Sequence, residues 1–278
     1  MLTIILHTSK TMLVEKLPST QVEIPIVHAE TNKLRGYLRT LNKKQVFTTM
    51  QVSEGLVSKI CQLIHNTKLP HLPALDIFLG DIYSGLQAQS FTPEDRQYAN
   101  DHLFILSGLY GVLRALDEIQ PYRLEMGYKL PGNAHDPSQP NITSLYEFWG
   151  DKIAKQLPKN QDIINLSAVE YTKAVFPYIK GTKKIKPLEG FENTKIITPK
   201  FLTISPKTKE PTFVTVHAKI ARGAYARWLI QNRIEDLGKL KDFEEIGYKY
   251  NQELSTPEEP VFVAKEFKGL GLSIRLTK

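Results

Sequence analysis

Four short apolar runs, at residues 3–7, 75–79, 103–106 and 162–166, are separated by longer segments of mixed polarity. Each run has the length of a strand that is buried on both faces, as strands of parallel sheets are. Strands that alternate with helical segments are typical of α/β folds. We therefore expect a mixed sheet with surrounding helices.

The segments between these runs show the spacing of apolar side chains that favours helices. We expect helices at residues 33–41, 43–64, 142–157 and 218–234, and another that begins at Thr92-Pro93-Glu94-Asp95. Thr92 is a suitable N-cap there, and Pro93 fits the first helical position. Residues 41–44 are expected to join two helices as a helix–turn–helix, and residues 131–140 to form a surface loop. Because strand-like pieces recur at residues 213–216 and 261–264, α+β is the alternative to α/β. No repeat or linker divides the chain, so we expect one domain over residues 1–278.

Each of the four apolar runs stops at small or polar residues. The first ends at Thr8-Ser9-Lys10-Thr11, and the last at Ser167-Ala168. If the four strands lie parallel and side by side, these endings meet at one edge of the sheet, where open α/β sheets bind ligands. The alternative is that they are ordinary turn residues.

The positive charge of the chain is concentrated in one stretch. Residues 151–233 hold 16 Lys and Arg against 6 Asp and Glu, a net charge of +10, whereas the whole chain has +7. A field of this kind attracts polyanions. A solvated lysine-rich face, such as Lys180, Lys183, Lys184 and Lys186, is the equal alternative.

Several classes of site are disfavoured by composition. The single cysteine, Cys61, rules out an intramolecular disulfide, a CxxC pair and a multi-cysteine metal site. The seven histidines show no close metal-ligand spacing. The apolar stretch at residues 2–6 is too short for a signal sequence or a membrane span, so we expect a cytoplasmic protein with no membrane partner. We expect no cofactor and no metal.

A series of sequence blocks resembles the YaaA family over nearly the whole chain. The blocks lie at residues 80–88, 106–114, 121–127, 146–151, 164–167, 170–171, 218–219, 221–223 and 232–233. The resemblance implies an unusual α/β fold with a positively charged cleft and a helix–hairpin–helix element. It also implies a cytosolic protein that binds DNA and helps bacteria to survive peroxide by limiting iron-dependent damage. It implies no established reaction.

Two segments depart from the pattern of that family. The first strand usually runs into Ser-Pro-Ala-Lys-Thr, but here the string is His7-Thr8-Ser9-Lys10-Thr11, which lacks the proline. The hairpin candidate within residues 33–64 lacks, at residues 41–46, the glycine that lets backbone amides approach phosphate. A hairpin that only packs is therefore an alternative to one that contacts DNA.

Double-stranded DNA, recognised by shape rather than sequence, is the expected partner. The expected DNA- or anion-binding residues are Lys10, Arg114, Arg123, Lys219, Arg222 and Arg233, with Ser9, Thr11, Ser107, Asn165 and Ser167 supporting the cleft. On a helix, Lys219, Arg222 and Arg233 would share one 60-degree arc. Gly223 would weaken that helix, so a loop around Lys219 and Arg222 is the alternative.

The rival hypothesis is an enzyme that acts on a nucleotide or another small phosphate-bearing substrate in the same cleft. Glu125 and Glu170 are the candidate catalytic residues, because a dry pocket would raise the pKa of either carboxyl. Tyr110, Tyr122 or Trp149 would stack a base, unless they belong to the core. A third hypothesis, direct iron binding, rests on His7 and His217 alone.

Overall fold

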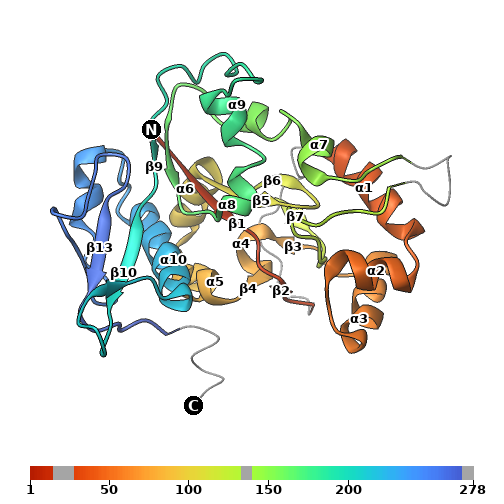
Figure 1. The fold of residues 1–278 in the computed structure, drawn as a ribbon, viewed down its shortest axis with the longest axis horizontal. Helices are drawn as coiled ribbons and strands as arrows, with labels where there is room; N and C mark the ends of the chain where they lie inside the picture. The colour runs from red at the N-terminus through yellow and green to blue at the C-terminus, as the bar shows by residue number, and fades with distance from the viewer. Residues whose placement is uncertain (15–27, 133–139, 271–278) are drawn as a thin grey trace.

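The computed structural model describes residues 1–14, 28–132 and 140–270, so the loop predicted at residues 131–140 lies mostly outside the described residues. A five-stranded sheet forms the centre, in the order β6-β5-β1-β8-β9 (Figure 1). Its strands are β1 (Leu2–His7), β5 (Leu103–Ser107), β6 (Gly111–Arg114), β8 (Asp162–Asn165) and β9 (Ile196–Ile197). Strands β5, β1, β8 and β9 are parallel, and β6 is antiparallel to β5.

Strand β1 is the central strand of this sheet, and all six of its residues are buried there. Ile4 lies opposite Leu103 on one side and Ile164 on the other. Three of the four predicted strands are therefore confirmed, and their ends meet at one edge. The prediction is wrong for residues 75–79, which form the helical turn α4 (Ala74–Ile77) and the two-residue strand β4 (Phe78–Leu79). The turn is buried except for Asp76, whose carboxylate pairs with Arg96, so its apolar pattern does not distinguish it from a strand.

A second sheet has the order β11-β10-β13-β12. Its strands are β10 (Lys200–Ile204), β11 (Pro211–Thr212), β12 (Tyr248–Tyr250) and β13 (Val261–Ala264). Strand β13 confirms the prediction at residues 261–264, but residues 215–216 of the predicted strand 213–216 belong to a helix. Two short ladders join β2 (Thr11–Met12) to β4, and β3 (Leu72–Pro73) to β7 (Glu118–Ile119).

Helices surround both sheets, and the described residues confirm the α/β class. The longer helices are α1 (His28–Thr40), α2 (Lys43–Met50), α3 (Glu54–His65), α6 (Pro93–His102) and α10 (Thr215–Gln231). The shorter ones are α5 (Asp81–Leu86), α7 (Leu145–Trp149), α8 (Val169–Thr172) and α9 (Phe176–Lys180), with 3-10 turns η1 (Ala88–Ser90), η2 (Ala154–Gln156) and η3 (Leu237–Asp242). No helix in the described parts of the chain is long and apolar enough to cross a membrane.

Local signals explain where these helices begin and end. The predicted start at Thr92 is confirmed, since Thr92 and Asp95 form a reciprocal capping box. Asn42 caps α2 in the same way, so the predicted joint at residues 41–44 is also confirmed. The single helix predicted at 43–64 is wrong, because Gln51 adopts a left-handed conformation and ends α2 before α3 begins. The helix predicted at 142–157 stops at Gly150, which has a positive φ.

Helix α10 is continuous through Gly223, so the predicted loop alternative is wrong. Gly223 packs against α5, and a Cβ atom there would lie 1.8 Å from the carbonyl oxygen of Ile82. Gly85 makes the reciprocal approach, because its Cβ would lie 2.0 Å from the oxygen of Ile220. The two glycines allow the backbones of α5 and α10 to touch, and this packing outweighs the low helix propensity of glycine.

The other face of α10 packs on the second sheet. Tyr225 of α10 contacts Phe201 of β10 and Phe243, with ring centroids 5.7 and 5.0 Å apart. Phe262 of β13 stacks on Phe201 at 5.5 Å. Figure 1 shows α10 between this sheet and α5, so one helix is shared by both halves of the fold. The side chains at the start of α10 are thereby placed near the edge of the central sheet.

Candidate anion-binding cavity

A cavity of about 390 Å³ opens where β1 and β8 end. Its walls come from the segment after β1, the start of α5, the segment that leads into α8, and α10. The lining residues are His7, Thr8, Ser9, Lys10, Thr11, Gly80, Asp81, Ile82, Glu125, Ala168, Glu170, Tyr171 and Lys219. The strand-end crevice predicted from the sequence therefore exists, although the wall at Gly80–Ile82 follows the short β4 rather than a long strand.

His7, the last residue of β1, is a buried hydrogen-bond donor in this cavity. Its Nδ1 accepts a hydrogen bond from the backbone N–H of Ala168 at 3.1 Å. Since a backbone amide can only donate, the proton of the neutral ring is on Nε2. Burial, together with the charges of Arg222 and Lys219, lowers the pKa of His7 to about 3. The ring is therefore neutral and fixed in one tautomer at physiological pH.

Tyr171 lines the cavity beside both His7 and Thr8. Its ring stacks on His7 with centroids 5.0 Å apart, and its hydroxyl lies 3.1 Å from the hydroxyl of Thr8. The same hydroxyl lies close enough to Glu125 to lower the pKa of that carboxyl. The contacts with His7 and Thr8 fix the position of the Tyr171 side chain.

Two carboxylates lie at the Glu125 end of the cavity. Burial raises the pKa of Glu125, and Lys10, whose Nζ is 3.9 Å from the carboxylate, opposes that shift. The charge of Glu170 raises the same pKa further. Glu170 is itself oriented by the backbone N–H of Gly127, which donates to Oε1 at 2.8 Å. Glu125 is thus more readily protonated than an exposed carboxyl.

Helix α10 supplies the cations of the opposite end. Lys219 is exposed and lines the cavity, whereas Arg222 is mostly buried one turn further along the helix. Both side chains lie close enough to His7 for their charges to act on its pKa. Within residues 1–14, 28–132 and 140–270, neither is ion-paired with a carboxylate. Burial lowers the pKa of Arg222.

Most of the predicted site residues line the cavity or lie close to it. Ser9, Lys10, Thr11, Glu125, Glu170 and Lys219 line the cavity, and Arg222 lies behind its wall. The supporting residues Ser107, Asn165 and Ser167 are buried beneath it. Ser107 bonds to Tyr122 at 2.6 Å, and Asn165 accepts the N–H of Ser167 at 3.0 Å.

Three predicted arginines do not line the cavity. Arg114 pairs with Asp117 at 3.1 Å on β6, and Arg123 lines a separate small cavity beside Tyr122. Arg233 pairs with Asp95 at 2.8 Å and covers the ring of Tyr98. It lies beyond the end of α10 with φ at 50°, so the shared helical arc predicted for Arg233 does not exist.

The cavity also contains Thr8, Asp81 and Tyr171, which are not among the individual residues expected to bind a ligand, although Thr8 belongs to a predicted strand ending. It contains His7 as well, which is expected only as a possible iron ligand. Their position directly after or at the end of a strand, or at the start of α5, was the available signal. The aromatic side chains proposed to stack a base are part of the core. Trp149 is fully buried and donates to the carbonyl of Gly108 at 3.0 Å.

The iron-binding hypothesis gains no support from the histidines. No group of three or more potential metal ligands occurs among the described residues. His7 has its Nδ1 lone pair occupied and its proton on Nε2, so the neutral ring offers no lone pair to a metal. His217 lies in the first turn of α10, where it hydrogen-bonds to Thr203 of β10 and stacks on Phe267.

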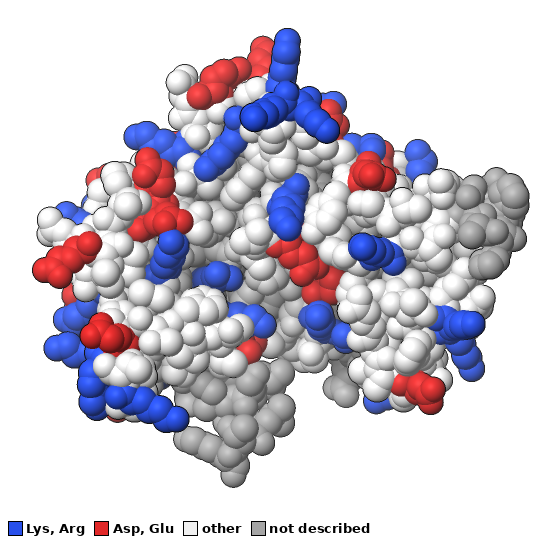
Figure 2. All heavy atoms as spheres, viewed as in Figure 1, with Lys and Arg blue, Asp and Glu red and all other residues white. Residues whose placement is uncertain are grey.

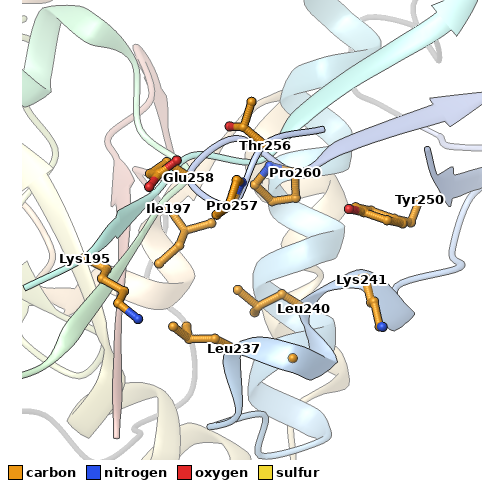
Figure 3. A pocket seen from close by; sticks show the side chains of 11 residues that line it. Lys195, Ile197, Leu237, Leu240, Lys241, Tyr250, Thr256, Pro257, Glu258 and Pro260 are labelled. Carbon is orange, nitrogen blue, oxygen red and sulfur yellow. The ribbon is translucent and has the colours of Figure 1, made fainter. Parts of the chain in front are cut away.

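A larger cavity of about 460 Å³ lies between β9, η3 and the segment before β13 (Figure 3). Leu237, Leu240 and Ile197 line it together with prolines, and Lys195 and Lys241 lie on opposite sides (Figure 3). The two lysines do not converge on one point, and the walls are mainly apolar. The strand-end cavity, although smaller, holds the convergent polar groups that a binding site requires.

Charge on the face that Figure 2 shows is mixed. Acidic side chains lie in the hollow at the middle of this face, and basic side chains stand around it, separated from one another (Figure 2). Bound anions would therefore meet cations at the rim of the hollow and carboxylates in its interior.

The chain is similar in sequence to known proteins over nearly its whole length. A family model described as peroxide stress protein YaaA matches residues 2–254. The chain belongs to the YaaA family. A UPF0246 protein of Salinispora tropica is 45% identical over 275 residues, which cover 98% of this chain and 97% of that protein. A UPF0246 protein of Marinomonas sp. is 34% identical over 94% of this chain and 96% of its own. Membership of the YaaA family supports a role in peroxide stress.

Proposed function

We propose that this member of the YaaA family acts in the peroxide stress response by binding duplex or distorted DNA, and so helps to limit iron-dependent oxidative damage. The observation that carries the proposal is the position of Lys219 and Arg222. Lys219 lines the strand-end cavity and Arg222 lies behind its wall, and neither is ion-paired with a carboxylate in the described structure. Unpaired cations beside a hollow are suited to phosphate oxygens.

The carboxylates decide how DNA would approach. Glu125 and Glu170 lie in the cavity and would repel a phosphate that entered from a duplex. The backbone of the duplex would therefore contact the rim, at Lys219 and Lys10, rather than the interior. A bent or gapped duplex can bring two stretches of backbone to the rim at once, which favours recognition of shape over sequence.

The test is fluorescence anisotropy with a straight duplex, a gapped duplex and a single strand, each over a series of salt concentrations. We expect the gapped duplex to bind most tightly, with an affinity that falls steeply as salt rises. Lys219→Glu should weaken this binding about tenfold at low salt, because one phosphate contact is replaced by a repulsion. Arg222→Glu should act in the same direction.

The matched control is Lys239→Glu, which makes the same change of net charge on η3 at an exposed residue that does not line the cavity. It should leave the affinity nearly unchanged. Equal losses for Lys219→Glu and Lys239→Glu would show that only the overall charge matters, and the proposal of DNA binding at this cavity would then be abandoned.

A further inference from the structure

We infer that the strand-end cavity binds a small phosphorylated sugar, such as a sugar monophosphate or a mononucleotide. The phosphate would lie beside His7 and Lys219, with the charge of Arg222 behind the wall, and the sugar hydroxyls beside Glu125 and Glu170. This inference is independent of whether duplex DNA binds at the rim.

The volume of the cavity sets the size of the ligand. Small-molecule sites usually occupy about 300 to 1,000 Å³, and this cavity has about 390 Å³. A duplex, whose major groove alone is about 12 Å wide, cannot enter it. Only a single small group can reach His7 and Tyr171, so the interior and the rim serve different ligands.

The polar groups of the cavity are sorted into two ends. The charges that act on His7 come from Arg222 and Lys219. Those that act on Glu125 come from Lys10, Glu170 and Arg123. A ligand that satisfies both ends must be anionic at one end and must donate hydrogen bonds at the other. A sugar phosphate has this chemistry, because carboxylates accept hydrogen bonds from sugar hydroxyls.

The phosphate end offers donors that do not depend on pH. His7 presents its Nε2–H in a fixed tautomer, because Ala168 occupies Nδ1. Lys219 and Arg222 add positive charge beside it. Arg222 is partly buried and is not ion-paired with a carboxylate within the described residues.

The sugar end offers acceptors that are already positioned. Glu170 is held through Oε1 by the backbone of Gly127, and Glu125 is held by Tyr171 and by Lys10. Tyr171 also stacks on His7 and therefore sets the separation of the two ends. Inorganic phosphate alone would satisfy only one end, and an unphosphorylated nucleoside only the other.

Isothermal titration calorimetry of the full chain with ribose 5-phosphate, AMP, adenosine and inorganic phosphate tests this inference. We expect ribose 5-phosphate and AMP to bind at least about tenfold more tightly than adenosine or inorganic phosphate. A single strand carrying a 5′-phosphate, compared with the same strand lacking it, shows whether the phosphorylated sugar can also be the end of a DNA strand.

Two variants should act on different ends of the ligand. Lys219→Gln should weaken ribose 5-phosphate and AMP about tenfold and leave adenosine unchanged. Glu125→Gln should weaken ribose 5-phosphate but not inorganic phosphate, because it removes an acceptor for hydroxyls and a repulsion for the anion. Lys239→Gln is the control, and thermal unfolding of each variant confirms that it is folded.

The inference is overturned if ribose 5-phosphate binds no more tightly than inorganic phosphate, or if Lys219→Gln and Lys239→Gln have equal effects. Either result can occur while DNA still binds at the rim. Conversely, the binding of sugar phosphates with no binding of DNA would contradict the proposed function and support this inference.

Discussion

His7 shows how one hydrogen bond can decide the chemistry of a residue. From the sequence, this histidine was a weak candidate metal ligand, because its type and position permit that role. The amide of Ala168, which is distant in sequence, donates to Nδ1 and turns the ring into a neutral donor. A contact of this kind depends on the pairing of β1 with β8 and cannot be inferred from residue spacing.

The lowered pKa of His7 predicts how stability depends on pH. The folded-state pKa is about 3 and the ordinary value is 6.5, so between these values the unfolded chain binds a proton that the folded chain does not. The free energy of unfolding should therefore fall as the pH falls from 6.5, by about 1.4 kcal/mol per pH unit from this group.

Urea denaturation of the protein and of His7→Gln at pH 7, 6, 5 and 4 measures this contribution as the difference between them. Nitrogen-detected NMR of the His7 ring provides a check if the variant does not fold. The ring should remain in the neutral Nε2–H form at pH 5, and an imidazolium at that pH would contradict the prediction.

The partners of single residues also explain which predicted cations reach the cavity. Lys219 and Arg233 are both basic residues of the α10 region, yet only Lys219 lines the cavity. Arg233 instead forms an ion pair with Asp95, which also takes part in the capping box of α6. The residue type could be predicted to bind an anion, but its partner could not, because Asp95 is far away in the sequence.

At the scale of elements, buried strands and capped helices could be predicted well. Strands β1, β5 and β8 are predicted correctly because each has a buried apolar centre and is followed by small or polar residues. The error at residues 75–79 arose because a buried helical turn gives the same apolar pattern. The division of α2 from α3 depends on the left-handed Gln51, for which the sequence carries no strong signal.

The low helix propensity of glycine predicts a break in the helix at Gly223, but in the fold Gly223 allows α10 to pack closely against α5. Gly223→Ala should destabilise the protein by roughly 3 kcal/mol, because the added methyl meets the carbonyl of Ile82. The matched control is Gly36→Ala in α1, where nothing lies within 4 Å of the added methyl. That change should stabilise the helix by about 0.5 to 1 kcal/mol. Thermal and urea unfolding of both variants compare the two sites, and similar effects would contradict the close crossing of α5 and α10.

At the scale of the whole molecule, the sequence shows where the basic residues are concentrated along the chain, but it does not show which of them lie at the cavity. Of the basic residues between 151 and 233, Lys155, Lys200, Arg227 and Arg233 form ion pairs with acids. Lysines 183, 184 and 186 lie exposed between α9 and β9, outside the cavity. Only part of the excess charge therefore meets at the candidate site.

From this distribution we expect the affinity for DNA to depend more on where a basic residue lies than on the net charge of the chain. Replacing Lys183, Lys184 and Lys186 together by Gln lowers the net charge of +7 by three. If the rim of the cavity binds DNA, this triple variant should lose less affinity than Lys219→Glu alone, as measured by anisotropy at one low salt concentration. A greater loss for the triple variant would place the DNA contact on the α9 side instead.

The crossing of α5 and α10 has a consequence for motion. Because backbone atoms meet at Gly85 and Gly223, no change of rotamer can accommodate sliding of one helix along the other. Lys219 and the segment at Gly80 therefore keep a constant separation. Since α10 is also packed on the aromatic side chains of the second sheet, we expect α5, α10 and that sheet to move together if this wall of the cavity shifts relative to the ends of β1 and β8.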